Sequence, residues 1–355
     1  MQVGEIHIME GNGNLVSSLD GEYGLVLSEL RNDLAAITEE YTRSIRDFQG
    51  SLIVFTHFKD RASPAPAYFV PIYNETIGTG MGAIDRRSIF GVSQLDGFIN
   101  MQSLESHGDG LIKILLHEVA HRHLAYMKVQ TQTSTKTIDL TGREGGHWHA
   151  AFNSQGSILE GYGWRESGPG RFVSVSKQDR FAPIDLYALG LESAEELGNL
   201  FFIRDARVVS GARLPAAADL PIGTVVTGTR ADFTGLDLVR TMGQRPPNNE
   251  MQVAFLLLTA PGETTTSSSV IATAERLEEV RQELEEAWRS SSNGKGKLIT
   301  TAIKANAVDA STGHGGSPPN ATECQCESTR SLGTQGIFSP IILASLFCLR
   351  RRRTT

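Results

Sequence analysis

Cysteine is nearly absent from this 355-residue chain, since its three cysteines, Cys324, Cys326 and Cys348, all lie close to the carboxyl terminus. The body of the protein therefore has no thiol for a disulfide or a metal site. Any metal site in the body has to use histidine and carboxylate ligands. A basic stripe is also missing, because acidic and basic residues are interspersed and the formal net charge is -7. This charge pattern argues against a nucleic-acid partner.

A signal peptide is the third absence. Residues 1–20 contain no basic region followed by an apolar stretch, which is the pattern that directs export. The composition itself, 40% hydrophobic and 21% charged, is ordinary for a globular protein. We predict one folded domain over residues 1–304, a flexible linker with a cysteine motif over 305–335, and a hydrophobic segment with an arginine cluster over 336–355.

The carboxyl terminus carries a pattern of its own. Residues 311–319 are rich in serine, glycine and proline, as in flexible linkers, and the apolar run Ile337–Leu349 precedes the arginines at 350–353. The run contains Pro340 and is shorter than the ~20 residues that a spanning helix needs. Over residues 322–353 this arrangement resembles the C-terminal sorting tails of myxobacterial surface proteins, which implies a protein at the cell surface or secreted. A plain membrane anchor is the alternative.

In both cases we expect membrane contact only through this tail. A sorting tail without an export signal would serve nothing, so we expect residue 1 to lie inside a longer gene product.

The strongest chemical signal is His117-Glu118-Val119-Ala120-His121, an HExxH motif inside the apolar run 111–125. The run predicts a buried helix, on which two histidines four residues apart lie on one face and can bind one metal ion. Glu118 can then reach a metal-bound water as general base. The alternative is that these side chains are hydrogen-bonded core residues. His123 falls off the ligand face, and we expect it to lie beside the site or at the surface.

Three further motifs follow the HExxH helix. They are His147-Trp148, the segment Ser-Ile-Leu-Glu-Gly-Tyr-Gly-Trp at 157–164, and the segment Pro-Ile-Asp-Leu-Tyr-Ala-Leu-Gly-Leu at 183–191. With these motifs in this order, residues 50–303 resemble a group of secreted bacterial zincin-like metallopeptidases. The resemblance implies an α+β, zincin-like catalytic domain over residues 1–304. Its mixed sheet is expected to carry an edge strand and to pack on the metal-binding helix.

Hydrophobic periodicity predicts the elements of this domain, and they fit one domain better than two. Residues 97–101 are expected to be the edge strand before the metal helix, of the kind that holds an extended substrate by strand addition. Helices are predicted at 22–48 and 271–289, an exposed loop at 131–137, and further strands at 52–56, 68–73, 201–203, 224–227, 251–258 and 297–303.

A catalytic zinc needs a third protein ligand besides the two histidines of the motif. The pattern HExxHxxGxxH is excluded because Leu124 and Met127 stand at its glycine and its third histidine. We favour His147, because it lies in a Gly-Gly-His-Trp loop and matches the His-Trp element of the resembling group. The alternatives that remain open are His149, Glu160 and Asp185.

One carboxylate and two tyrosines are candidates for supporting roles. Asp185 is expected to orient His121 or His147 rather than to bind the metal. Tyr162 and Tyr187 are candidates to donate a hydrogen bond to the oxyanion of a tetrahedral intermediate. The alternative for each tyrosine is a packed aromatic ring with its hydroxyl at the surface.

Together these residues predict a zinc-dependent hydrolase that cleaves peptide bonds of a protein or peptide substrate, with Zn²⁺ as cofactor and Glu118 as base. One alternative is a zinc amidase that acts on an amide of the cell envelope. The other is a non-catalytic surface protein with a structural metal. This last alternative is disfavoured because structural zinc sites are usually closed and rich in cysteine, and because it leaves Glu118 without a role.

Overall fold

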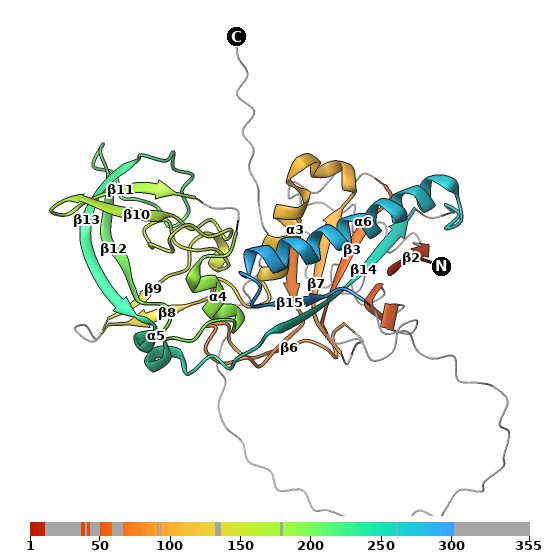
Figure 1. Cartoon of the computed structure of the whole chain (residues 1–355), viewed down its shortest axis with the longest axis horizontal. Helices are drawn as coiled ribbons and strands as arrows, with labels where there is room; N and C mark the ends of the chain where they lie inside the picture. The colour runs from red at the N-terminus through yellow and green to blue at the C-terminus, as the bar shows by residue number, and fades with distance from the viewer. Residues whose placement is uncertain are drawn as a thin grey trace, which may run out of the picture.

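Two β-sheets and the helices around them form the framework of the computed structural model (Figure 1). The structure describes residues 1–10, 37–39, 41–42, 50–58, 67–90, 92, 94–131, 136–177, 180–260 and 262–301. Most of the predicted helix at 22–48 and the whole linker and tail from 305 onward lie outside these residues. No helix in the described ranges is long and apolar enough to cross a membrane. The described part is α+β with a mixed sheet, as the sequence predicts.

The larger sheet has seven strands and a parallel centre. Antiparallel strands lie at its two ends, and β15 pairs in parallel with β14 beside the main path. In spatial order the main path is β1 (Gln2–Val3), β2 (Ile6–Glu10), β14 (Glu250–Thr259), β3 (Gly50–Thr56), β7 (Leu95–Gln102) and β4 (Tyr68–Pro71), with β15 at Lys297–Ile299.

The prediction that residues 97–101 form the edge strand was wrong. These residues lie within β7, which pairs with β3 on one side and with β4 on the other, so β4 is the strand at the edge. Strand order is set by pairing between segments far apart in the sequence, and hydrophobic periodicity carries no information about it.

Alternate residues of the central strands pack on opposite faces of this sheet. In β3, Ile53 and Phe55 belong to one buried cluster, whereas Leu52 and Val54 belong to another. Side chains of a strand alternate between its two faces, so both faces of β3 are covered. This double burial explains why β3 and β14 are apolar throughout instead of alternating with polar residues.

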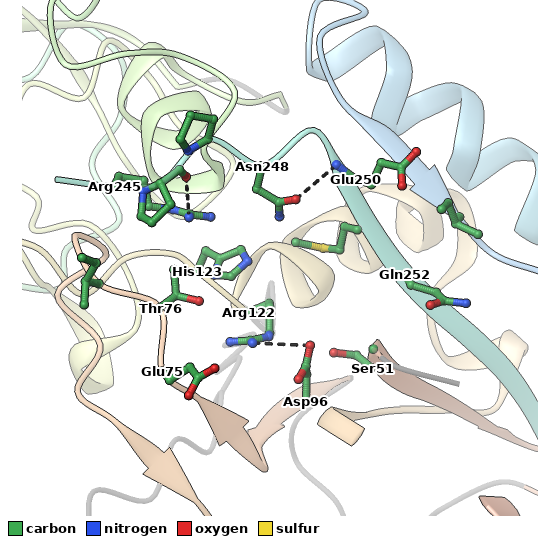
Figure 2. A pocket seen from close by; sticks show the side chains of 16 residues that line it. Ser51, Glu75, Thr76, Asp96, Arg122, His123, Arg245, Asn248, Glu250 and Gln252 are labelled. Carbon is green, nitrogen blue, oxygen red and sulfur yellow. Dashed lines mark hydrogen bonds and ion pairs between the residues drawn. The ribbon is translucent and has the colours of Figure 1, made fainter. Parts of the chain in front are cut away.

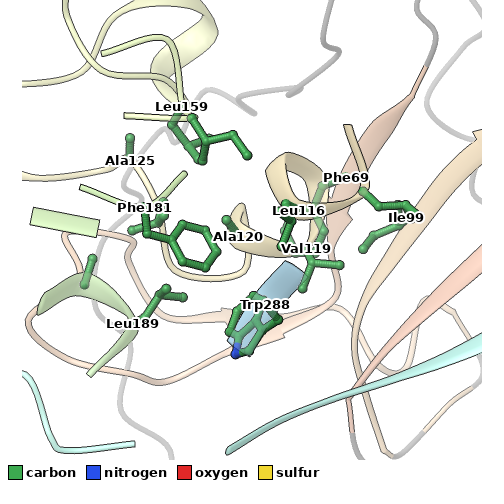
Figure 3. Packing of buried hydrophobic residues seen from close by; sticks show 14 of the residues in the cluster. Phe69, Ile99, Leu116, Val119, Ala120, Ala125, Leu159, Phe181, Leu189 and Trp288 are labelled. Carbon is green, nitrogen blue, oxygen red and sulfur yellow. The ribbon is translucent and has the colours of Figure 1, made fainter. Parts of the chain in front are cut away.

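Helices α3 (Leu111–Ala120) and α6 (Ser268–Ser291) lie over the same face of the larger sheet (Figure 1). Val119 of α3 and Trp288 of α6 belong to the same buried cluster, which also includes Phe181 (Figure 3). The apolar run 111–125 predicts a longer helix than the one found. Helix α3 ends at Ala120, and His121 follows as its C-cap with helical dihedral angles.

The smaller sheet is antiparallel and lies beside the larger one (Figure 1). One apolar cluster contains Leu257 of the larger sheet, Ile184 of helix α4 (Pro183–Leu189) and Phe233 of the smaller sheet, so both sheets share a core. Residues 132–135 of the predicted loop at 131–137 lie outside the described residues, and Thr137 begins β9 (Thr137–Asp139), which pairs with β8 (Lys128–Gln130). The smaller sheet runs β10 (Gly163–Gly168), β11 (Arg171–Ser176), β13 (Val225–Thr234) and β12 (Asn199–Val208), and the other elements are β5 (Tyr73–Asn74), β6 (Ile84–Asp85), β8 (Lys128–Gln130), β9 (Thr137–Asp139), α4 (Pro183–Leu189) and α5 (Gly235–Met242).

Candidate metal centre

Three buried histidines converge in the interior. Nε2 of His117 lies 3.1 Å from Nε2 of His147 and 3.1 Å from Nε2 of His121. All three residues offer a ligand atom within 4.8 Å of the others, which is close enough to bind one metal ion. His117 and His121 come from α3 and its C-cap, as the HExxH motif predicts. His147 is the third member, as the sequence analysis favours.

The other ring nitrogen of each histidine faces a backbone carbonyl. Nδ1 lies 3.0 Å from the Ile158 oxygen in His117, 3.4 Å from the Leu124 oxygen in His121, and 3.0 Å from the Arg143 oxygen in His147. A carbonyl can only accept, so Nδ1 of each ring carries the proton and donates it. Burial also lowers the pKa of all three rings, which keeps them neutral.

Three Nε2 lone pairs therefore face one another with no proton between them. Nearby lone pairs repel in a buried site, and a cation between them removes that repulsion. Metal-binding histidines typically donate the second ring nitrogen to a carbonyl or carboxylate, which fixes the tautomer and the ring orientation. The arrangement of the three rings therefore fits a metal ion that prefers imidazole ligands.

Glu118 lies on α3 next to the first histidine and is buried. Its Oε2 has no hydrogen-bond partner among the described residues. Burial raises the pKa of this carboxyl to about 8. A carboxyl with this pKa is protonated at neutral pH, and a cation held by the three histidines would lower the pKa and leave the side chain as a carboxylate.

A short loop places His147 opposite the helix. Thr141 and Trp148 form an isolated antiparallel bridge, and the amide of Gly142 donates to the His147 carbonyl at 2.6 Å. A side chain at Gly142 would lie 2.5 Å from the Trp148 oxygen, so only glycine fits there. This tight closure turns the His147 ring toward α3.

Asp185 does not orient a histidine, contrary to the expectation from the sequence. Its Oδ1 accepts from the indole of Trp148 at 2.7 Å, and its Oδ2 accepts from the amide of Ala182 at 2.7 Å. Ser157 also contacts this carboxyl, whose pKa burial raises to about 6. Asp185 therefore affects the site indirectly. It links Trp148, the residue after His147, to the start of α4.

The motifs recognised in the sequence meet around the three histidines. Ile158, in the segment 157–164, receives the His117 Nδ1 hydrogen bond, and the neighbouring carbonyl of Leu159 accepts from the amide of Trp148 at 3.0 Å. Trp148 in turn binds Asp185 of the segment 183–191. Segments separated in the sequence thus build one site.

Arg143 is a charged neighbour that the sequence analysis did not select. Its Nη2 lies 3.4 Å from Nε2 of His147 and 2.5 Å from Oε1 of Glu160, while its Nε donates to Oε2 of Glu160 at 3.3 Å. Glu160 is therefore bound to an arginine and is not part of the histidine cluster. The sequence contained one indication of this role, which is that Arg143 lies four residues before His147 in the same glycine-rich loop.

The remaining candidates have structural partners. Nδ1 of His149 accepts from the amide of Ala151 at 3.0 Å, and burial lowers the pKa of that ring to about 4. The hydroxyl of Tyr162 donates to the Ala218 oxygen at 2.9 Å and accepts from the Leu220 amide, so it is not available as an oxyanion donor. The Tyr187 hydroxyl is buried near Arg245, and its described contacts include none of the three histidines.

Comparisons with protein-family models, with curated protein sequences and with solved structures found no match to this chain.

Proposed function

We propose that this protein is a zinc-dependent, zincin-like metallopeptidase. The observation that carries the proposal is the convergence of three Nε2 lone pairs beside the unpartnered carboxylate oxygen of Glu118. Three protein ligands with a fourth position left for water or substrate are typical of catalytic zinc, whereas structural zinc usually has four ligands, many of them cysteine. His117, His121 and His147 would hold Zn²⁺, which would supply a water of pKa near ~7 and would polarise the substrate carbonyl.

The side chains around the ligands supply the rest of the chemistry. Glu118 takes the proton of the attacking water and passes it to the leaving amine. Arg143 lies within 3.4 Å of the His147 ring, and its guanidinium stabilises the negative charge that develops on the substrate oxygen. Glu160 holds the guanidinium in place through its two carboxylate oxygens. Arg143 thus takes the role that the sequence analysis considered for Tyr162 and Tyr187.

A protein or peptide substrate fits the sheet next to the site. The ring of Phe69, on β4, lies 6.5 Å from the His121 ring between centroids, so β4 runs beside the metal ligands. Among the described strands β4 pairs only with β7, which leaves its other edge for strand addition by an extended peptide. The location at the cell surface or outside the cell is part of the same proposal and rests on the resemblance of residues 322–353 to sorting tails.

The deciding experiment compares the wild type with Glu118→Gln in a casein and peptide-library digest, with zinc content measured on the same samples. The variant keeps the ligands and loses the base, so we expect about one zinc per chain and a loss of at least ~10³-fold in hydrolysis. A chelator should abolish the wild-type activity. Equal digestion by the variant would refute the mechanism.

The same assay separates the alternatives. Zinc without hydrolysis of any peptide, combined with release of amides from cell-envelope material, would indicate the amidase. Zinc without either activity, with a large fall in melting temperature on chelation, would indicate a structural metal.

A further inference from the structure

A second polar site lies at the amino-terminal ends of the larger sheet's parallel strands. A cavity of about 660 Å³ is lined by Ser51 of β3, Asp96 of β7 and Gln252 of β14 (Figure 2). Arg122 and His123, which directly follow the last residue of HExxH, form part of its wall. None of the three clustered histidines lines it, so this cavity is a separate site.

Three basic side chains of the wall are more than nine-tenths buried, with exposures of 8% for Arg122, 5% for His123 and 6% for Arg245. Figure 2 shows His123 between the two arginines. Burial lowers the pKa of Arg245, and the guanidinium group of Arg122 lowers it further. The two guanidinium groups are therefore close enough to repel each other.

Arg245 has no carboxylate partner among the described residues. Its Nε, Nη1 and Nη2 donate to the carbonyls of Ala188, Pro246 and Leu189 at 2.8, 2.7 and 3.1 Å. These bonds use three of its five N–H groups and leave its charge without a counter-ion. The carbonyl oxygens offset part of this buried charge, and an anion in the cavity would stabilise it further.

The carboxylates of the wall do not meet this need. Asp96 pairs with Arg122 at 3.4 Å, and Arg122 also donates to Asn74 at 2.9 Å. Glu250 is exposed and pairs with Lys297 at 3.6 Å, while Glu75 is exposed at the rim. His123 adds an unsatisfied polar atom, since its buried Nδ1 has no hydrogen-bond partner in the described part of the chain. A ligand bound in the cavity would give this nitrogen a hydrogen-bond partner.

We propose that this cavity binds a small molecule with an oxyanion group, a carboxylate or a phosphate, which Arg245, Arg122 and His123 hold. The volume admits a ligand larger than the anion alone, and Asn248, Gln252 and Ser51 offer hydrogen bonds to its uncharged part. The site does not depend on the proposed peptidase activity, because none of its residues is a metal ligand.

The test is isothermal titration of the full-length protein with inorganic phosphate and, separately, with succinate, at constant ionic strength set by sodium chloride. The protein is titrated with its metal, and the cavity variants described below distinguish binding in the cavity from binding to the metal. We expect saturable binding of at least one anion with one site per chain. Phosphate alone would identify a phosphate ligand, succinate alone a carboxylate ligand, and both an oxyanion site of either chemistry.

Matched variants locate the binding. Arg245→Gln removes the buried charge, and Arg165→Gln removes an exposed charge on β10 as its control. His123→Phe keeps a ring of similar shape without nitrogen and leaves the contacts of Arg245 intact, so it serves if Arg245→Gln does not fold. We expect at least ~10-fold weaker binding in both cavity variants and less than ~2-fold change in the control. No saturable binding of either anion, or an equal loss in the control, would overturn the proposal.

Discussion

His121 and His123 are two residues apart, and both are buried, yet they belong to different sites. His121 turns Nε2 toward His117 at 3.1 Å and has Nδ1 near the Leu124 carbonyl. His123 lines the cavity, and its Nδ1 has no partner among the described residues. Burial alone therefore does not identify a metal ligand. What identifies it is one ring nitrogen held by a carbonyl and the other pointing at further imidazoles.

Helix α4 connects the two sites. Near its start, Asp185 binds the indole of Trp148, which follows the third histidine. At its end, the carbonyls of Ala188 and Leu189 accept hydrogen bonds from Arg245 in the cavity wall. Substitutions of the histidines, and of residues near either end of α4, can therefore test whether the two sites are distinct.

The largest expected effect is on metal content. His121→Ala should lower zinc from about one per chain to less than ~0.1, because it removes one of three ligands. His123→Ala should keep about one zinc. His147→Ala and His149→Ala form a second such pair, with the loss expected only at His147. Inductively coupled plasma mass spectrometry on purified full-length protein measures all four, and zinc loss from His123→Ala would remove the distinction between the sites.

Arg143→Gln should reduce kcat by about 10²-fold and leave zinc content unchanged, because it removes one charged donor from the developing oxyanion. KM should change less than kcat, since the interaction strengthens in the transition state. Arg165→Gln removes an exposed arginine from β10 and serves as the control. A variant with normal kcat would exclude Arg143 from the reaction.

Gly190→Ala should destabilise the fold next to the cavity, where Gly190 packs against Pro246 and Asn248. Gly190 has φ of +84°, and a Cβ there would lie 2.8 Å from the Asn248 nitrogen and 2.9 Å from the Pro246 oxygen. We expect a loss of about 2–3 kcal/mol in the free energy of unfolding, from backbone strain plus this clash. Gly211→Ala, with φ of +85° and open space around it, isolates the strain at about 1 kcal/mol. Urea unfolding of both variants tests this. Equal losses in the free energy of unfolding would show that the backbone at Pro246 and Asn248 moves aside without cost.

Asp185→Asn tests the metal side through pH. Burial raises the pKa of Asp185 to about 6, above the ~3.9 of an unfolded aspartate. Its contribution to stability is therefore fully present below pH ~4 and is lost as pH rises through 6. Between pH 4 and pH 7 the wild type should lose up to about 2 kcal/mol more than the variant.

Urea unfolding at several pH values in 1,10-phenanthroline measures this difference without a contribution from metal release. Asp109→Asn replaces an exposed carboxylate and should follow the wild type. Parallel pH curves for Asp185→Asn and the wild type would contradict the expectation.

The sequence predicted the features that depend on interactions between residues close together in the chain. The runs in β3 and β14 and the amphipathic pattern of α6 follow from side-chain periodicity, and the two motif histidines follow from helical spacing. The edge position of β4 and the partners of Tyr162 did not follow, because they depend on contacts with remote segments. The cavity was missed for the same reason, since its wall comes from distant parts of the chain.

The third histidine comes from a loop, and His117 and His147 are 30 residues apart in the sequence. A metal ion held by both would act as a cross-link, in a chain whose cysteines all lie near one end. In the chain-entropy account, closing a loop of this size stabilises a fold by about 3–4 kcal/mol. Metal supply would then control how long the protein survives as well as whether it reacts, because the metal-free form should open and be degraded first.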